Sequence, residues 1–360
     1  MVTRRQYLLQ SAAALVGFYG SGQGLASPLR SPLTVLVEVD LSTRSRDVGR
    51  AIEAGVREAS TVDPKGLRVQ VINTQGNVRR AQDAMREAMM HPSILAIIGG
   101  GDANISAGLR ASVKQDAIPY GIAWATDLPA LLDDPWSIRL GLSEPQCLID
   151  LMTQARALPT KRWGFLFSQD ALGRASYDAL TALLASNLGP QVVGVQWHDL
   201  SAHTLRAQWL SLQEQGAQMV WFVGQPRAAR ILANAMQTAK SQTQVPVLAC
   251  SSAWSAQWAM ELKPQAFALP IYFVLPQLPA SHSAKRSAGM HPAYAFADAL
   301  TKALLEALAI SPHPANLRSL RETVRTQWTL LQRQQDQLPP ALYHYGASQW
   351  QAVTFSHLWQ

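Results

Sequence analysis

Short apolar runs alternate with amphipathic stretches over the first third of the chain. Apolar runs that predict strands lie at 33–39, 67–72, 94–98 and 118–123. Stretches with apolar residues at helical spacing lie at 47–60, 78–90 and 104–116. This alternation of strand and helix predicts a parallel sheet that helices cover on both faces.

The same alternation begins again after position 160. Further strands are predicted at 163–167, 192–197, 219–223 and 245–249, and helices at 176–187, 204–215, 227–240, 292–309 and 316–331. The aromatic-rich tail at 341–355 predicts a closing hairpin. Two successive α/β units predict two doubly wound, Rossmann-like lobes. We expect the chain to cross between them near 139–146, near 270–280 and once more towards the C-terminus.

The N-terminus has the features of an export signal. Arg4 and Arg5 precede an apolar run at 11–19, and the small residues Gly24 and Ala26 follow. This pattern predicts a signal peptide over 1–26 that is cleaved after Ala26. The paired arginines, followed by an aromatic residue and two leucines, resemble a twin-arginine signal. A general secretory signal is the alternative.

Composition limits the function further. The chain has 360 residues, of which 48% are hydrophobic and 15% are charged, as is typical of a folded protein with two domains. Its 31 Lys and Arg against 24 Asp and Glu are dispersed, which favours a solvated surface over nucleic-acid binding. Neither the histidines nor the two cysteines follow a metal-site pattern, so we expect no metal and no cofactor. Whether Cys147 and Cys250 form a disulfide stays open.

Three loops that follow predicted strands carry candidate ligand-binding residues. The first has three glycines, at 99–101, followed by Asp102 and Asn104. Glycines let a ligand approach the backbone, and the N–H groups of the next helix favour an anionic or carbonyl oxygen. The alternative is a tight turn in which Asp102 caps the helix and no ligand is needed. Both interpretations stay open.

The second loop contains Trp124, which can stack on a ligand, and Thr126, which can donate through its hydroxyl. In the alternative interpretation Trp124 lies in the core and Thr126 caps a helix. The third loop contains Cys250, Ser251 and Ser252, whose hydroxyls suit a polar ligand group. Serine-rich loops are also common as plain turns.

Enzyme motifs are missing from the sequence. It has no GxSxG nucleophile elbow, no GxGxxG fingerprint and no phosphate loop ending in GKS or GKT. Its acidic residues and histidines lie in unrelated contexts. We therefore expect a protein that is not an enzyme.

The order of these features resembles the type I periplasmic binding proteins, in particular the branched-chain amino acid receptors of ABC transporters and their amide-binding relatives. The resemblance runs from about 33 to 355 and is carried by the segments at 97–126, 136–139, 162–173 and 216–224. It implies two α/β lobes joined by a hinge, the first formed by 27–142 and 275–330 and the second by 143–274 and 331–360. It also implies a periplasmic protein without cofactors that acts as a monomer.

The resemblance also implies a ligand site between the lobes. Positions that match the family's ligand-binding residues are Ala103, Asn104, Trp124, Ala125, Thr126, Gln225 and Ser252, with Leu172 near a family tyrosine. Three positions depart from the family pattern: a serine is replaced by Ala103, a small residue by Trp124, and the acid that pairs with the ligand ammonium by Ser252. An unpaired buried ammonium is unfavourable, so a zwitterionic amino acid is not the expected ligand.

We therefore expect a small acid, amide or aromatic molecule as the ligand. The function implied is capture of this solute for an ABC importer, with an ABC permease as partner. The alternative is a periplasmic sensor or accessory protein of the same fold that has no transport role.

Overall fold

The computed structural model describes residues 32–42, 45–63, 66–125, 134–141, 143–155, 162–186, 190–199, 201–238, 245–254, 270–279, 291–311, 316–338, 340–346 and 349–353. Two predictions fall outside these residues: the signal peptide over 1–26 and the placement of Thr126.

The first sheet is formed by five strands from the N-terminal part of the chain. These are β1 (Thr34–Val39), β2 (Arg68–Asn73), β3 (Ile94–Gly99), β4 (Tyr120–Ile122) and β5 (Ser137–Arg139). They lie in the order β2-β1-β3-β4-β5 and every neighbouring pair is parallel. β1 and β3 are buried along their whole length, as their continuous apolar runs predict.

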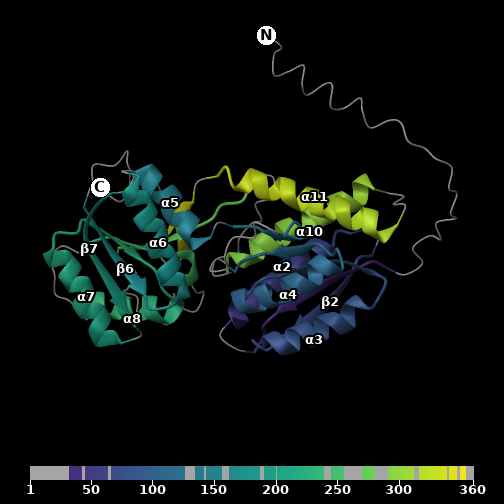
Figure 1. Cartoon of the computed structure of the whole chain (residues 1–360), viewed down its shortest axis with the longest axis horizontal. Helices are drawn as coiled ribbons and strands as arrows, with labels where there is room; N and C mark the ends of the chain where they lie inside the picture. The colour runs from purple at the N-terminus through teal and green to yellow at the C-terminus, as the bar shows by residue number, and fades with distance from the viewer. Residues whose placement is uncertain are drawn as a thin grey trace, which may run out of the picture. The chain divides into compact units, whose positions relative to one another are not determined.

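Helices from both ends of the chain pack with this sheet. Those that connect its strands are α2 (Arg46–Ser60), α3 (Val78–Met89) and α4 (Ala103–Gln115). Two more come from the C-terminal part of the chain: α10 (Ala293–Ile310) and α11 (Leu317–Gln335). α10 lies along α2, and α11 contacts β3 and β5 (Figure 1). The indole N–H of Trp328 on α11 donates to the Leu300 carbonyl on α10 at 2.8 Å.

The second sheet has seven strands. Five are parallel: β6 (Arg162–Ser168), β7 (Gln191–His198), β8 (Met219–Phe222), β9 (Val247–Ala249) and β10 (Ile271–Leu275). The hairpin of β11 (Ala341–Gly346) and β12 (Gln349–Val353) adds an antiparallel edge, which confirms the predicted closing hairpin. The sheet order is β12-β11-β10-β9-β8-β6-β7.

Among the described residues, four α-helices and one short turn of 3₁₀-helix precede or follow the parallel strands of the second sheet. They are α5 (Glu144–Ala155), α6 (Ala171–Ala185), α7 (Ala202–Glu214), α8 (Pro226–Thr238) and η1 (Ser251–Ala253). Together the two sheets and their helices confirm the predicted fold of two α/β lobes.

One predicted boundary is wrong, and one strand was not predicted. The helix predicted from 176 begins at Ala171, because the carboxylate of Asp170 accepts a hydrogen bond from the Gly173 N–H at 3.0 Å and caps the helix five residues earlier. The segment 270–280, predicted only as a crossing, begins with β10. Its register beside β9 and β11 places this strand inside the second sheet.

Gly141 lies where the segments between the sheets meet. Its N–H, just after β5, donates to Oε1 of Gln335 at the end of α11 at 2.7 Å. A Cβ at Gly141 would lie 3.5 Å from Cγ of Pro276, which follows β10. Gly141 has φ +97°, a left-handed conformation that favours glycine. Gly141 is therefore hydrogen-bonded to the end of α11 and lies near the segment that follows β10.

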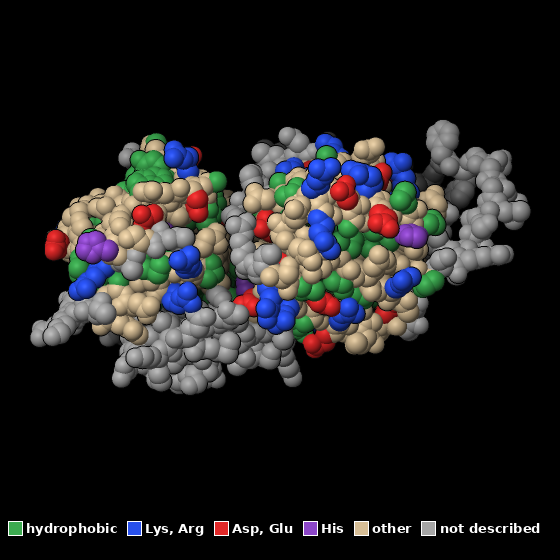
Figure 2. Space-filling model, turned by 90° about the horizontal axis from the view of Figure 1, so that it is seen from below, with side chains coloured by type: hydrophobic (Ala, Val, Ile, Leu, Met, Phe, Trp, Pro, Cys, Tyr) green, Lys and Arg blue, Asp and Glu red, His purple; other side chains and the backbone are tan. Residues whose placement is uncertain are grey.

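Charged side chains of both signs lie on one face of the molecule (Figure 2). On the face shown in Figure 2, Lys and Arg side chains are interspersed with Asp and Glu rather than gathered in one basic stripe. Within the part of the chain that the structure describes, none of the helices has the length and hydropathy needed to cross a membrane.

The close packing of α2 on α10 depends on Gly55. We predict that Gly55→Ala destabilises the protein by about 1–3 kcal/mol, because a Cβ there would overlap the Tyr294 carbonyl, a backbone group that cannot rotate away. Alanine is the better helix former by only about 1 kcal/mol. Denaturant unfolding measures the change.

Gly101→Ala is the matched control for this substitution. Its Cβ would lie 3.5 Å from Cγ1 of Val48, an ordinary contact, so the expected change is within about 0.5 kcal/mol. Equal stability of Gly55→Ala and the wild type would contradict the proposed role of Gly55.

Candidate functional site

A buried carboxyl group supports the first of the three loops. Glu38, near the end of β1, is 1% exposed. Its Oε2 accepts hydrogen bonds from the Gly100 N–H at 3.0 Å and from the Tyr120 hydroxyl at 2.9 Å. A Cβ at Gly99 would overlap this carboxyl group, which explains the glycine there. Glu38 therefore links β1 to the loop that follows β3 and to Tyr120, the first residue of β4.

Burial shifts the acid–base behaviour of this group. Desolvation raises the pKa of Glu38, the hydrogen bonds from Gly100 and Tyr120 oppose that shift, and the nearby Asp102 and Asp40 raise the pKa further. Burial and the neighbouring Glu38 raise the pKa of Tyr120 as well. The Tyr120 hydroxyl is also 3.0 Å from Oγ of Ser106 on α4.

Asp102 caps α4. Its Oδ1 accepts from the backbone N–H of Asn104 at 2.9 Å and of Ile105 at 3.3 Å, which confirms that Asp102 caps the helix. The predicted site residues Ala103 and Asn104 lie in the first turn of α4, where Ala103 is half-buried and Asn104 is exposed.

Trp124 in the second loop is 6% exposed and packs on residues at the start of α10. Its ring centroid is 4.7 Å from that of His291, with the rings nearly perpendicular, and 6.2 Å from that of Phe296. The next residue, Ala125, has φ +33°, a left-handed conformation that is strained for a residue with a Cβ. Strain of this kind is typical of loops whose geometry the rest of the fold imposes.

The third loop is organised by Glu144, a fully buried residue at the start of α5. Its Oε1 accepts from the Ser252 N–H and the Ser252 hydroxyl, both at 2.8 Å, and from the Ser251 hydroxyl at 2.5 Å. Its Oε2 accepts from the Ser251 N–H at 3.2 Å. The predicted site residue Ser252 is therefore hydrogen-bonded to an acid of the chain itself.

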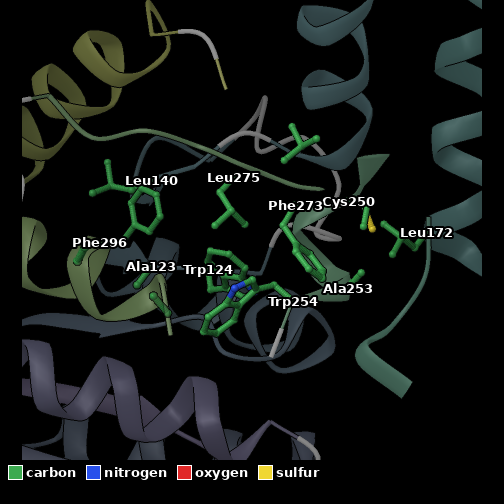
Figure 3. Packing of buried hydrophobic residues seen from close by; sticks show 14 of the residues in the cluster. Ala123, Trp124, Leu140, Leu172, Cys250, Ala253, Trp254, Phe273, Leu275 and Phe296 are labelled. Atoms are coloured by element: carbon green, nitrogen blue, oxygen red, sulfur yellow. The ribbon is translucent and has the colours of Figure 1, made fainter. Parts of the chain in front are cut away.

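The second and third loops meet at His291. Trp254, which follows η1, is 4% exposed, and its ring centroid is 4.7 Å from that of His291, again nearly perpendicular. Figure 3 shows Trp124 and Trp254 within one apolar cluster, together with Phe296 on α10, Leu140 after β5 and Phe273 on β10. The structure thus brings two of the three loops together around one imidazole ring.

Two other predicted positions, Gln225 and Leu172, lie at the start of a helix. Gln225 is exposed just before α8, where its carbonyl accepts from the Ala229 N–H at 3.1 Å. Leu172 is buried in the first turn of α6.

Sequence reasoning missed Glu38, Tyr120, Glu144 and His291. A charged residue inside the apolar run at 33–39 was a signal for Glu38. No local pattern marks the other three, because their partners are distant in sequence.

Both cysteines are free and buried. Burial raises the pKa of each thiol, so neither is a reactive thiolate. Among the described residues no cluster of His, Cys, Asp and Glu could hold a metal ion.

Comparison with known proteins identifies the family. Residues 36–314 match the family model described as "Periplasmic binding protein". The chain belongs to this family. No curated protein matches the sequence. The family is one of periplasmic substrate-binding proteins, which are generally not enzymes.

Solved structures share the fold of this periplasmic binding protein. A type 1 periplasmic binding protein from Bordetella pertussis Tohama I has TM-score 0.68 and 14% identity, over 90% of this chain and 100% of that one. A leucine-binding protein from Thermotoga maritima MSB8 has TM-score 0.66 and 15% identity, over 89% and 98%. A fatty acid ABC transporter substrate-binding protein from Thermomonospora curvata has TM-score 0.62 and 16% identity, over 90% and 91%.

We predict that Glu38 makes the stability of this periplasmic binding protein depend on pH. Because its pKa is raised in the fold, the native state binds the proton more tightly than the unfolded state. That stabilisation is complete below the ordinary glutamate pKa and is lost as pH rises through the raised value. Glu38→Gln cannot titrate, so its stability relative to the wild type should improve with rising pH.

Thermal unfolding between about pH 4 and pH 8 measures this difference. Glu53→Gln on α2, which removes a carboxyl group paired with Arg57 at the surface, is the control and should not reproduce the trend. Parallel curves for Glu38→Gln and the wild type would disprove the effect.

Proposed function

We propose that the protein captures a small polar or aromatic molecule between its two lobes and delivers it to an ABC permease. The family and the fold, those of ABC transporter substrate-binding proteins, support this role. The proposal takes 27–142 with 275–330 as the first lobe and 143–274 with 331–360 as the second, and it takes the protein to act as a monomer.

The contact of Trp124 and Trp254 with His291 is the observation that carries the proposal. Trp124 follows the last residues of β4 in the first sheet, and Trp254 follows β9 and η1 in the second. Ligands of doubly wound sheets bind beyond the carboxyl ends of the strands. Aromatic residues from the ends of both sheets therefore lie where a ligand would contact both lobes.

We propose a site formed by seven residues from these loops. They are Ala103, Asn104, Trp124, Ala125, Thr126, Gln225 and Ser252. Fold similarity leaves the ligand open, since the similar structures include one named for leucine and one named for fatty acids. The proposed ligand is a small acid, amide or aromatic molecule rather than a zwitterionic amino acid. Glu144, the buried acid at the third loop, already accepts four hydrogen bonds and is not placed to pair with a ligand ammonium.

A second candidate function is that of a periplasmic sensor or accessory protein without a transport role. The burial of Trp124 against His291 and Phe296 favours it, because both aromatic partners belong to the proposed first lobe. In that case Trp124 fills the site and no small molecule binds there.

We predict that Trp124→Ala weakens ligand binding by about tenfold or more. Burial of an aromatic face contributes on the order of 1–3 kcal/mol, and about 1.4 kcal/mol corresponds to a factor of ten. Isothermal titration of small acids, amides and aromatic compounds identifies the ligand and then measures the change in Kd.

Conservative variants separate binding from folding. Trp124→Phe should also weaken binding, whereas Trp209→Phe, at a fully buried tryptophan on α7, should not. Unchanged affinity in Trp124→Ala would remove this residue from the site, and a wild type that binds no compound would favour the second candidate.

We also propose that the protein reaches the periplasm through a twin-arginine signal cleaved after Ala26. Replacing Arg4 and Arg5 by lysine should abolish export, while Arg30→Lys, beyond the cleavage site, should not. Cell fractionation with N-terminal sequencing measures both. Undiminished export of the double variant would indicate the general secretory route instead.

A further inference from the structure

The backbone donors of the loop between β3 and α4 are bonded to carboxyl groups of the chain itself. The Gly100 N–H donates to Oε2 of Glu38, and the N–H groups of Asn104 and Ile105 donate to Oδ1 of Asp102. The start of a helix ordinarily offers such donors to an anionic ligand. Here Asp102 holds that position at α4.

Charge at the same loop also opposes an anion. The carboxyl groups of Asp102 and Asp40 raise the pKa of Glu38, so both lie near the buried side chain that supports the glycine loop. A ligand carboxylate would therefore meet charge of its own sign in a buried setting, where charges interact more strongly than in water. In addition, the N–H groups of Gly100, Asn104 and Ile105 already donate hydrogen bonds to Glu38 and Asp102.

The third loop also disfavours a ligand carboxylate. The hydroxyls of Ser251 and Ser252 both donate to Glu144, so neither hydroxyl proton is available to a ligand oxygen. Towards a ligand, Ser252 can act only as an acceptor. A carboxylate brings only acceptors to such a site, whereas an amide or amidine brings N–H donors.

We propose that Asp102 and Glu144 are specificity-determining residues that exclude anionic ligands, so that the site takes an uncharged molecule with N–H donors. This inference rests on the proposed function and narrows it, because it removes the small acids from the three ligand classes. Asp102 acts through its charge and through the donors it occupies at the start of α4. Glu144 acts by fixing the direction of the serine hydroxyls.

Three compounds that share one ring test whether the site prefers an amide to an acid. Benzoate, benzamide and benzamidine differ mainly in charge and in the number of N–H donors, and acetate, acetamide and acetamidine repeat the series at smaller size. Isothermal titration of the full-length wild type should give binding of the amide that is about tenfold or more tighter than that of the matching acid.

Asp102→Asn tests the residue directly. Asparagine caps helices as well as aspartate does, so the variant keeps the start of α4 while it loses the charge. We expect the preference over the acid to fall by about threefold or more. Asp116→Asn makes the same change at the other end of α4, about 20 Å away, and should leave the preference unchanged.

The outcomes separate this inference from the proposed function. An acid that binds the wild type as tightly as its amide would disprove the exclusion of acids, while the proposed capture of a ligand would still hold. An unchanged preference in Asp102→Asn would overturn the assignment of Asp102. A wild type that binds no member of either series would count against ligand capture itself, and the selection would fall with it.

Discussion

The hydrogen bonds that Glu38 accepts from Gly100 and Tyr120 hold together the carboxyl end of the first sheet. Parallel pairing of β1, β3 and β4 places the ends of these strands side by side, and Glu38 lies between them. A buried carboxyl group without partners is strongly unfavourable, so the strand ends cannot separate without losing this stabilisation. The position of the glycine loop, and with it the start of α4, depends on this contact.

Glu144 has the same role at the second sheet as Glu38 has at the first, since each is a buried acid that accepts hydrogen bonds from a loop that follows a strand. The two acids leave the loops well ordered but poor in free donors. In the periplasmic binding protein, hydrogen-bond acceptors therefore lie at the loops of both sheets.

Aromatic residues then determine what the loops can hold. Trp124 and Trp254 come from different sheets and share the imidazole ring of His291. At the site that we propose, a ligand would fit beside that ring or replace it. An apolar face bounded by hydrogen-bond acceptors is complementary to a planar molecule with N–H donors, and it is a poor partner for a carboxylate.

Secondary structure and fold class could be predicted from the sequence because they depend on local patterns. Apolar runs and helical spacing located β1, β3, α2 and most other elements, since burial of one face imposes its period on neighbouring residues. The alternation of the elements then limited the topology to parallel sheets. Only the tertiary structure decided the partners of the site residues. Glu38 and Tyr120 are 82 residues apart, and Glu144 and Ser252 are 108 apart. Contacts over such separations leave no periodic trace in the sequence, because they depend on how distant strands and helices pack.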